Sequence, residues 1–335
     1  MPSEANYFSF VQQTFHYFSR PHSNAPIGPV HSAAAWRAAD MRADKDWREE
    51  ADIADIEEID RAMANAQATG KELGALTRED FPLPTVAEKI SQWRREISNG
   101  RGFKVIRGFP VDSWGEDTSS LFFWCLGLHL GVPGAQNRKG TLLGHVRDTG
   151  ADKTDPFVRQ YMTTQNIPFH CDAADIVGLL CLKKAKLGGK SRIASSVSIY
   201  NELADLRPDL TPLLFEPLML DTRDESAASG AHFIPVPICC FSDGELRTFY
   251  HAEYFRTSER HEGVRLTDEQ RQLLDLYDKI AASPTFHIDM DLEPGDIQLL
   301  SNHSIIHART DYEDFLEPER KRHLLRLWLS IEKAS

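Results

Sequence analysis

Apolar residues recur at helical spacing in the first part of this chain and in short strand-like runs over most of the rest. Between residues 47 and 68 they recur at helical intervals among many carboxylates, which predicts an amphipathic helix. The same pattern predicts helices at residues 86–97, 119–130, 197–203 and 267–281. Prolines and a glycine interrupt residues 1–45, which we therefore expect to be irregular.

Short strands dominate from about residue 140 onward, after one early strand at residues 103–110. Late strands are predicted at residues 286–290, 297–300, 305–309 and 322–331. Turns separate the strands at Gly188-Gly189, Asp243-Gly244 and Pro294-Gly295-Asp296. We expect a mainly β protein, an antiparallel jelly roll with N-terminal and inserted helices. The sequence has no internal repeat and no low-complexity linker, which favours a single domain with an N-terminal extension.

Composition narrows the classes of function. The 335 residues carry a formal net charge of -12, which argues against binding to nucleic acid or to an anionic membrane. No basic leader with an apolar core starts the chain, and no window of about 18 apolar residues follows, so we expect a cytoplasmic protein. The five cysteines lack zinc-type spacing and are expected to be buried, reduced thiols.

Three His-x-acid pairs are candidates for a metal site, and chance alone would produce about two in a chain of this composition. They are His170-Cys-Asp172, His251-Ala-Glu253 and His287-Ile-Asp289. If His170 and Asp172 lie on one strand, both side chains project from the same face. Only this first pair leaves room for a third ligand on a late strand. His251 is the better candidate for a substrate contact, and His287 is expected to be structural.

The third ligand is open between His303, His307 and His323. His303 and His307 are an even number of residues apart and would share a strand face, whereas His323 would face away from Arg322 and Arg326. The residue pattern favours His307, which follows an apolar strand introduced by a turn.

Several motifs follow the first pair in a fixed order. They are Phe169-His170-Cys-Asp172, Leu187-Gly-Gly-Lys-Ser191, Gly295-Asp296, Asn302, His307-Ala-Arg309 and Arg322-His-Leu-Leu-Arg326-Leu-Trp. In this combination the chain resembles the taurine dioxygenase (TauD/TfdA-like) family of Fe(II)/2-oxoglutarate-dependent dioxygenases, with clavaminate synthase and γ-butyrobetaine hydroxylase as wider relatives. The similarity runs from about residue 95 to residue 332.

The resemblance implies a fold and a metal centre. It implies a double-stranded β-helix, the clavaminate synthase-like jelly roll, as a catalytic domain at residues 95–335, with residues 1–94 as a helical extension packed on it. It also implies that His170, Asp172 and His307 hold Fe2+ as a facial triad with three open positions. In the family these positions serve 2-oxoglutarate and O2, and an unactivated C–H bond is oxidised with release of succinate and CO2.

The resemblance also implies two arginine roles. Arg322, fifteen residues after His307, would hold the distal carboxylate of 2-oxoglutarate through a bidentate fork. Ser191 takes the place of a family threonine whose hydroxyl serves the same cosubstrate. Arg326 shares a strand face with Arg322 and would face an anionic substrate group. Retention of Asp172 disfavours halogenation, so hydroxylation is expected, with desaturation and cyclisation as alternatives.

Substrate contacts are assigned to residues near the entrance of the expected site. They are Asn166, Gln160, Tyr161, His251 and Tyr254, together with Arg326. Residues 221–230 are expected to form a loop that closes over the site. The expected partner is a small, anionic organic substrate, and association into a homo-oligomer stays open. Two other classes remain, a zinc-dependent hydrolase and a non-catalytic jelly-roll binding module, and the paired arginines argue against the hydrolase.

Overall fold

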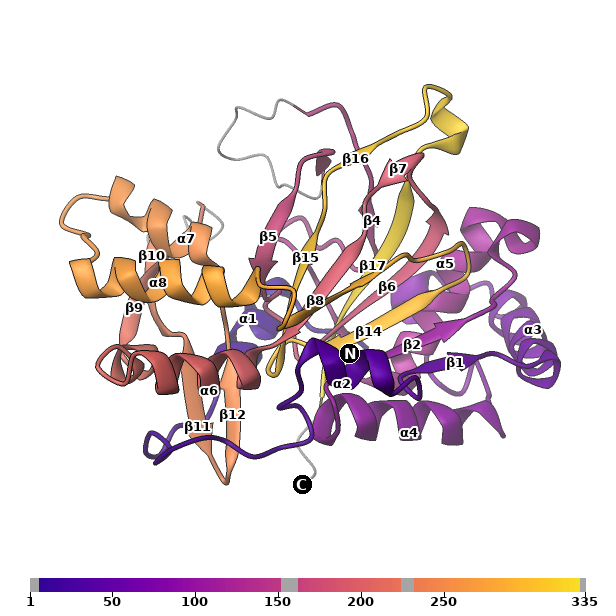
Figure 1. Ribbon diagram of the computed structural model, residues 1–335. Helices are drawn as coiled ribbons and strands as arrows, with labels where there is room; N and C mark the ends of the chain where they lie inside the picture. Colours follow the sequence, from indigo (N-terminus) through magenta and orange to yellow (C-terminus); the bar gives the residue numbers. More distant parts are fainter. Residues whose placement is uncertain (1–5, 152–161, 224–231, 332–335) are drawn as a thin grey trace, which may run out of the picture.

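Two β-sheets form the centre of the molecule, and helices cover them on opposite sides (Figure 1). The computed structural model describes residues 6–151, 162–223 and 232–331. Most of the central strands come from the second half of the chain, as the short apolar runs predict. The sheets therefore form the centre of the protein, with helices around them.

The larger sheet has seven strands in the order β1-β2-β14-β6-β17-β3, with β4 pairing with β17. Its strands are β1 (Arg48–Glu50), β2 (Phe103–Arg107), β14 (Ile297–Ser301), β6 (Ile176–Lys183), β17 (His323–Ser330), β3 (Val132–Gly134) and β4 (Gly144–Val146). All pairs are antiparallel except β1 with β2, which run parallel.

The smaller sheet has four strands in the order β13-β8-β15-β5, and all of its pairs are antiparallel. Its strands are β13 (His287–Met290), β8 (Ser191–Ser195), β15 (Ile305–Arg309) and β5 (Ile167–His170). A buried cluster joins the two sheets, with Ile193 and Ile305 from the smaller one packing with Val177 and Trp328 from the larger one. This packing holds the strand that carries His307 against the larger sheet.

Three two-stranded ribbons complete the β structure. They are β7 (Leu187–Gly188) with β16 (Tyr312–Glu313), β9 (Pro217–Asp221) with β10 (Phe233–Pro237), and β11 (Cys239–Ser242) with β12 (Glu245–Thr248). The predicted turns at Gly188-Gly189 and Asp243-Gly244 lie in these ribbons, and Gly188, Gly189, Asp243 and Gly244 all have positive φ. Short 3₁₀ helices occur at Leu73–Ala75, Thr211–Phe215, Ser258–Arg260 and Pro318–Arg320.

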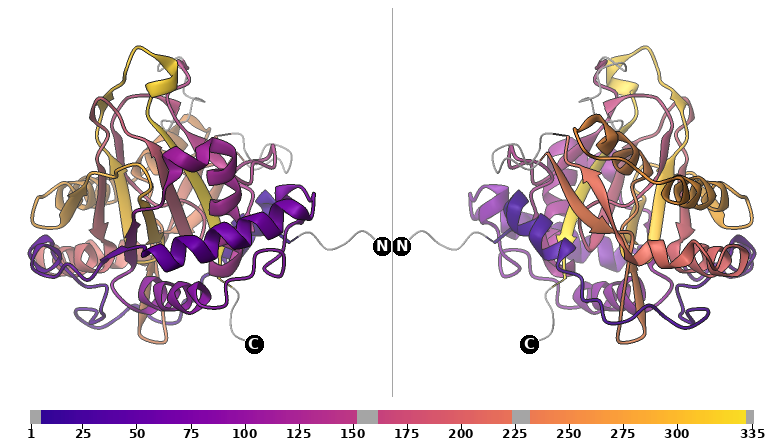
Figure 2. Two further views of the ribbon diagram at one scale, coloured as in Figure 1. Left: turned by 90° about the vertical axis from the view of Figure 1, so that its right-hand side faces the viewer. Right: turned by 90° about the vertical axis from the view of Figure 1, so that its left-hand side faces the viewer.

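Two groups of helices flank the sheets. Helices α3 (Ile53–Ala68), α4 (Val86–Asn99) and α5 (Val111–Leu130) share one buried cluster with strands β6, β14 and β17. Helices α6 (Ser196–Leu206), α7 (Ala252–Thr257) and α8 (Asp268–Ala281) belong to a second cluster. Figure 2 shows the purple helices in front of the sheets from one side and the orange and salmon elements in front from the other.

The expectation that residues 1–45 are irregular is wrong, because helices α1 (Phe10–Phe18) and α2 (Ala38–Ala43) lie there. A capping box between Ser9 and Gln12 starts α1. Its buried face carries Gln13 and Tyr17, which make hydrogen bonds to Ala173, Thr248, Asn302 and Ser330. Tertiary contacts therefore stabilise a helix of 9 residues, which is too short to be stable in isolation.

Two predicted helices have different starting points in the structure. The segment predicted as one helix from residue 47 begins as strand β1, and α3 starts only at Ile53, because Asp52 caps it through the N–H of Asp55. Helix α5 starts at Val111 and is kinked at Gly115, where φ is 74°. The remaining predicted helices agree with α4, α6 and α8 to within three residues at each end.

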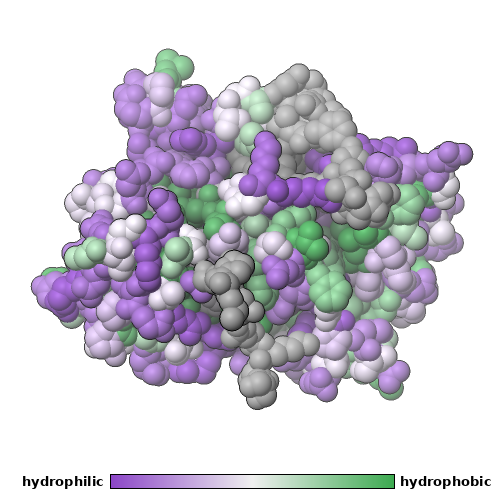
Figure 3. Space-filling model, turned by 180° about the vertical axis from the view of Figure 1, so that it is seen from behind, coloured by the Kyte–Doolittle hydropathy of each residue, from purple (hydrophilic) through white to green (hydrophobic). Residues whose placement is uncertain are grey.

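Two further expectations concern the surface and the thiols. The five cysteines are buried and free, as predicted. Within the described residues, no helix has both the length and the apolar character needed to cross a membrane. Figure 3 shows apolar residues gathered in the middle of the face seen from behind, with hydrophilic residues at its margins.

Candidate active site

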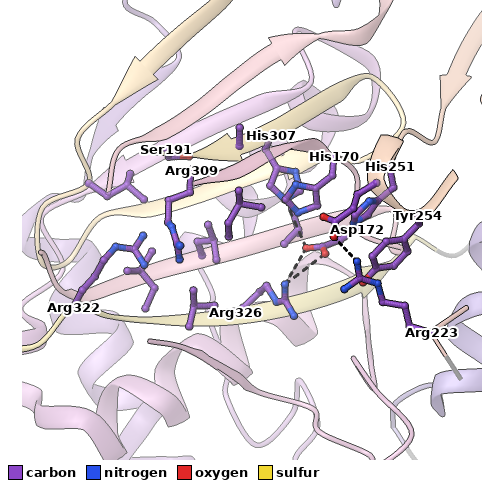
Figure 4. A pocket seen from close by; sticks show the side chains of 18 residues that line it. His170, Asp172, Ser191, Arg223, His251, Tyr254, His307, Arg309, Arg322 and Arg326 are labelled. Atoms are coloured by element: carbon purple, nitrogen blue, oxygen red, sulfur yellow. Dashed lines mark hydrogen bonds and ion pairs between the residues drawn. The ribbon is translucent and has the colours of Figure 1, made fainter. Parts of the chain in front are cut away.

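His170, Asp172 and His307 meet at one end of a cavity between the two sheets (Figure 4). His170 ends β5 and pairs across the smaller sheet with His307 on β15. One ligand atom from each of the three side chains lies within 4.8 Å of the others. The structure therefore brings together the pair and the late histidine that the sequence singles out.

Asp172 does not share a strand with His170, contrary to the expectation, because β5 ends at His170. The side chain of Asn302 positions the loop that follows. Its Oδ1 accepts a hydrogen bond from the N–H of Asp172 at 3.1 Å, and its Nδ2 donates to the carbonyl of Ala174 at 2.9 Å. A side chain from a distant loop thus replaces strand pairing in directing Asp172 toward the two histidines.

His303 is not part of this set. It lies before β15, and its Nε2 is 2.7 Å from Oδ1 of Asp175. The other oxygen of Asp175 is 2.8 Å from Nε2 of His16 and accepts from the N–H of Ile331 at 2.7 Å. The buried carboxylate therefore joins α1, the loop after β14 and the end of β17 directly beside the loop of Asp172.

Both histidines of the set are neutral at pH 7 and can act as metal ligands. Nδ1 of His170 lies 2.9 Å from the carbonyl of Pro168, which can only accept a hydrogen bond, so Nε2 keeps its lone pair. Burial lowers the pKa of His170, and it lowers the pKa of His307 to about 3. Imidazole nitrogens that do not have to lose a proton favour metal binding at neutral pH.

Asp172 is a charged carboxylate although it is buried. Burial raises its pKa, but the positive charge of Arg326, together with the interaction with the two imidazoles, outweighs burial and brings the pKa to about 2. Nη1 of Arg326 lies 3.4 Å from Oδ2 of Asp172, and Nε donates to Oε1 of Gln136 at 2.8 Å. Arg326 therefore lines the cavity, with its guanidinium directed at the carboxylate of Asp172.

Two more arginines point into the other end of the cavity, Arg309 from β15 and Arg322 from just before β17 (Figure 4). Among the described residues, no hydrogen-bond partner is present for Nε and Nη1 of Arg309 or for Nη1 of Arg322. Burial and the neighbouring Arg322 lower the pKa of Arg309 to about 10, which leaves it charged at pH 7. Buried cationic donors without partners are costly, so this end of the cavity is built for an anion.

The Gly188-Gly189 turn makes room for Arg322. Gly189 has φ 71°, and a Cβ at this position would lie 3.1 Å from Nε of Arg322. The next strand starts with Ser191, which lines the same cavity and donates from Oγ to Oε1 of Gln298 at 2.9 Å. The predicted pair of Ser191 and Arg322 is thus at the arginine-rich end.

His251 and Tyr254 lie on the other side of His170 and Asp172 from these arginines, with their rings stacked at 3.7 Å between centroids (Figure 4). Arg223 forms an ion pair with Glu253, and its guanidinium lies 4.4 Å from the centre of the Tyr254 ring. An imidazole, a phenol, a guanidinium and a carboxylate therefore border this part of the cavity (Figure 4).

Asn166, another predicted substrate contact, does not join this group. Asn166 is exposed and is not among the residues that line the cavity. Gln160 and Tyr161 lie outside the described residues, as does most of the loop predicted at 221–230. Asp221, expected to be part of that loop, is instead buried at the end of β9 and paired with Arg260.

Sequence reasoning missed Arg309, Arg223 and Glu253 as cavity residues. Arg309 is two residues after His307 on one strand, so strand alternation alone would have placed both side chains on the same face. Glu253 follows His251 at the same interval but begins helix α7, where that rule does not apply. Arg223 follows strand β9 and has a positive φ of 47°. No local pattern in the sequence predicts where its side chain points.

Comparison with known proteins gives the family. The model of the family "Taurine catabolism dioxygenase TauD, TfdA family" matches residues 65–328. FR-33289 synthase from Streptomyces rubellomurinus is 31% identical over 310 residues, which cover 91% of both chains. Among solved structures, asparagine oxygenase with Fe(II), 2S,3S-3-hydroxyasparagine and succinate superposes with a TM-score of 0.67 at 18% identity, covering 85% of this chain and 93% of that one.

The non-haem iron oxygenase OrfP in complex with Fe and alpha-ketoglutaric acid has the same kind of fold. Its TM-score is 0.63 at 17% identity, and the match covers 85% of this chain and 94% of OrfP. The resemblance seen in the ordered motifs is thereby confirmed, and with it the use of Fe(II), 2-oxoglutarate and O2. The chain belongs to the TauD/TfdA family and is an Fe(II)- and 2-oxoglutarate-dependent dioxygenase.

Proposed function

We propose that this dioxygenase hydroxylates an unactivated C–H bond of a small, anionic organic substrate, with His170, Asp172 and His307 as its iron ligands. The observation that carries the proposal is one cavity with two ends. Two neutral imidazoles and a charged carboxylate converge at one end, and two buried guanidinium groups, each with N–H donors that have no described partner, lie at the other.

The donor set suits Fe(II). Two histidines and one carboxylate are the facial triad of non-haem iron oxygenases, which leaves positions open for cosubstrate and O2. A double-stranded β-helix is the fold that would carry it. The order β4-β17-β6-β14 in the larger sheet and β13-β8-β15-β5 in the smaller one supports this fold. We take residues 95–335 as the catalytic domain and residues 1–94 as its helical extension.

The arginine-rich end is proposed to hold 2-oxoglutarate. Arg322 would bind the distal carboxylate, with the hydroxyl of Ser191 beside it, as the family resemblance implies. Arg309 adds a second guanidinium within the same end, with Nε and Nη1 directed at no other described group. Tyr312 supports both arginines, since its ring centre is 4.8 Å from the guanidinium carbon of Arg309 and 5.2 Å from that of Arg322.

Bound iron and 2-oxoglutarate supply the oxidation, in which O2 and the 2-oxo acid are converted with the substrate R–H to R–OH, succinate and CO2. The protein's own residues position these components. Arg326 keeps Asp172 in its charged form, and Pro168 fixes the tautomer of His170. The apolar lining, which includes Val146, Leu179 and Leu324, limits the entry of water.

Charge supports an anionic substrate. Among the described residues that line the cavity, four arginines face two carboxylates, which leaves a surplus of two positive charges. Fe(II) and doubly charged 2-oxoglutarate cancel each other, so the surplus persists in the loaded enzyme. We propose that Arg326, His251 and Tyr254 contact the substrate, and we add Arg223 to this set because its guanidinium borders the same part of the cavity.

The proposed activity can be tested by anaerobic titration of the metal-free protein with Fe(II) and 2-oxoglutarate. We expect a metal-to-ligand charge-transfer band that is lost in His307→Ala. A panel of small carboxylates, phosphonates, phosphates, sulfonates and neutral analogues is then screened for substrate-dependent succinate. Preferred turnover of neutral compounds, or unchanged turnover of every accepted anion in Arg326→Ala, would contradict the anionic class.

A further inference from the structure

A second group of potential metal ligands lies outside the cavity. Glu116 of α5, His145 of β4 and His323 of β17 each offer a ligand atom, and these atoms lie within 4.8 Å of one another. His323 is one of the three histidines that the sequence suggests as a third iron ligand. Its neighbours in the structure are Glu116 and His145 rather than the iron-site residues.

This group is on the opposite face of the β4–β17 pair from the iron site. Val146 pairs with Leu324, and both line the cavity. The adjacent His145 and His323 therefore point away from it, since side chains alternate across a strand. The two groups are separated by the sheet itself, so His323 cannot serve the iron.

The distances suit one shared ion. Nδ1 of His145 is 2.9 Å from Nε2 of His323 and 3.7 Å from Oε1 of Glu116, and one ligand atom from each of the three residues lies within 4.8 Å of the other two. Ligands bound at about 2.0–2.1 Å in a tetrahedron are separated by about 3.4 Å. Small side-chain rotations would bring all three donors to this spacing.

Glu116 reaches this position because α5 is kinked. Gly115 has φ 74° and ψ 179°, which a glycine adopts readily, and no heavy atom lies within 4 Å of its missing Cβ, other than those of its chain neighbours. The kink directs the next residue toward the sheet. Glu116, His145 and His323 are 49%, 38% and 6% exposed at their side chains, so an ion there keeps access to a water ligand.

The donor types also suit a metal. Two imidazoles and one carboxylate form a nitrogen-and-oxygen donor set of the kind that binds Zn2+ or Co2+.

We propose that Glu116, His145 and His323 form a second metal site, which binds Zn2+ or a similar divalent transition metal. Its ligands come from a helix and two strands that are far apart in the sequence. A bound ion would therefore link α5 to the outer face of β4 and β17. Arg322, which immediately precedes His323, would be held at the same point from inside the cavity.

Equilibrium dialysis of the metal-free full chain against Zn2+ at neutral pH, followed by metal analysis, measures the number of Zn2+ ions bound per chain. We expect two equivalents in the wild type and one in Asp172→Ala, whose iron site is impaired. His145→Asn should also bind one equivalent, and the double variant should bind none tightly. Zn2+ should raise the thermal midpoint of Asp172→Ala but not that of the double variant.

Two further variants test whether the second equivalent of Zn2+ binds at these three residues. His31→Asn removes an exposed imidazole elsewhere and should leave both equivalents in place. Glu116→Gln keeps the size of the side chain and removes its charge. It tests the same site if His145→Asn fails to fold. The count of bound Zn2+ requires no turnover and no 2-oxoglutarate, so the result does not depend on the proposed activity. A single equivalent in the wild type, or an unchanged second equivalent in both His145→Asn and Glu116→Gln, would overturn the proposal.

Discussion

Arg326 and Asp172 form a buried ion pair at the proposed iron site, with Nη1 3.4 Å from Oδ2 and each side chain only 10% exposed. The pair explains why a carboxylate can stay charged between two imidazoles before any metal is bound. It also gives Arg326 a structural role in addition to the proposed substrate contact. Both roles follow from one guanidinium that is fixed by Gln136 on one side and faces Asp172 on the other.

Replacing Arg326 by Gln should destabilise the metal-free protein by about 3–5 kcal/mol, because the buried charge of Asp172 loses its partner. Urea unfolding of the metal-free protein measures this change. Arg326→Lys, which keeps the charge, should lose less. If Arg326→Gln unfolds at the wild-type urea concentration, the ion pair contributes nothing to stability.

Replacing Arg322 by Gln should raise the KM for 2-oxoglutarate. Loss of one buried charged partner of a carboxylate costs about 2–4 kcal/mol, or roughly 30- to 1,000-fold in affinity. Initial rates of succinate formation over a range of cosubstrate concentrations measure it. Arg138→Gln removes an exposed arginine and serves as the control. Equal KM values in the two variants would mean that the cosubstrate binds elsewhere.

Asn302→Ala should weaken Fe(II) binding as well as stability. The change removes the two hydrogen bonds that direct the loop of Asp172, at a cost of about 1–3 kcal/mol for each group left unpaired. Fe(II) affinity and urea unfolding are measured together. Asn201→Ala also removes two hydrogen bonds, both to Val30, at a place remote from the site. It should lower stability alone, and an equal loss of Fe(II) affinity in both variants would contradict the role of Asn302.

Asp175 should make stability depend on acid pH. Burial raises its pKa, but hydrogen bonds from His16 and His303 outweigh burial and hold the pKa below its usual value. The unfolded chain therefore binds more protons over this range, and stability falls as the pH drops from about 5 through the unfolded value near 3.9.

Asp175→Asn should be less stable than the wild type at pH 7. The difference between their free energies of unfolding, the stability gap, should narrow between pH 5 and pH 3. Urea unfolding at several pH values measures the gap for metal-free protein. Asp112→Asn makes the same charge change at an exposed position and should show no such gap at any pH. If the stability gap of Asp175→Asn is constant with pH, the carboxylate of Asp175 is not the cause of the loss of stability in acid.

The local pattern of apolar residues was sufficient to predict the elements whose stability depends mainly on their own sequence. Helices α4 and α8 have strong apolar periodicity, and a capping box starts α8, so their positions were predicted closely. Helix α1 was missed because its stability depends on contacts of Gln13 and Tyr17 with residues more than 100 positions away. Strand β1 was missed for a related reason, since only pairing with β2 makes three residues extended.

The sequence by itself determined the family, the cofactors and a short set of candidate ligands, because the order of His170, Asp172, Ser191, His307 and Arg322 is a property of the chain. Only the tertiary structure decided between the three late histidines, through the pairing of His307 with His170 and the contact of His303 with Asp175. It also placed Arg309 and Arg223 in the cavity and His323 beside His145. Those outcomes depend on which distant segments pack together, and spacing along one segment carries no information about its partner.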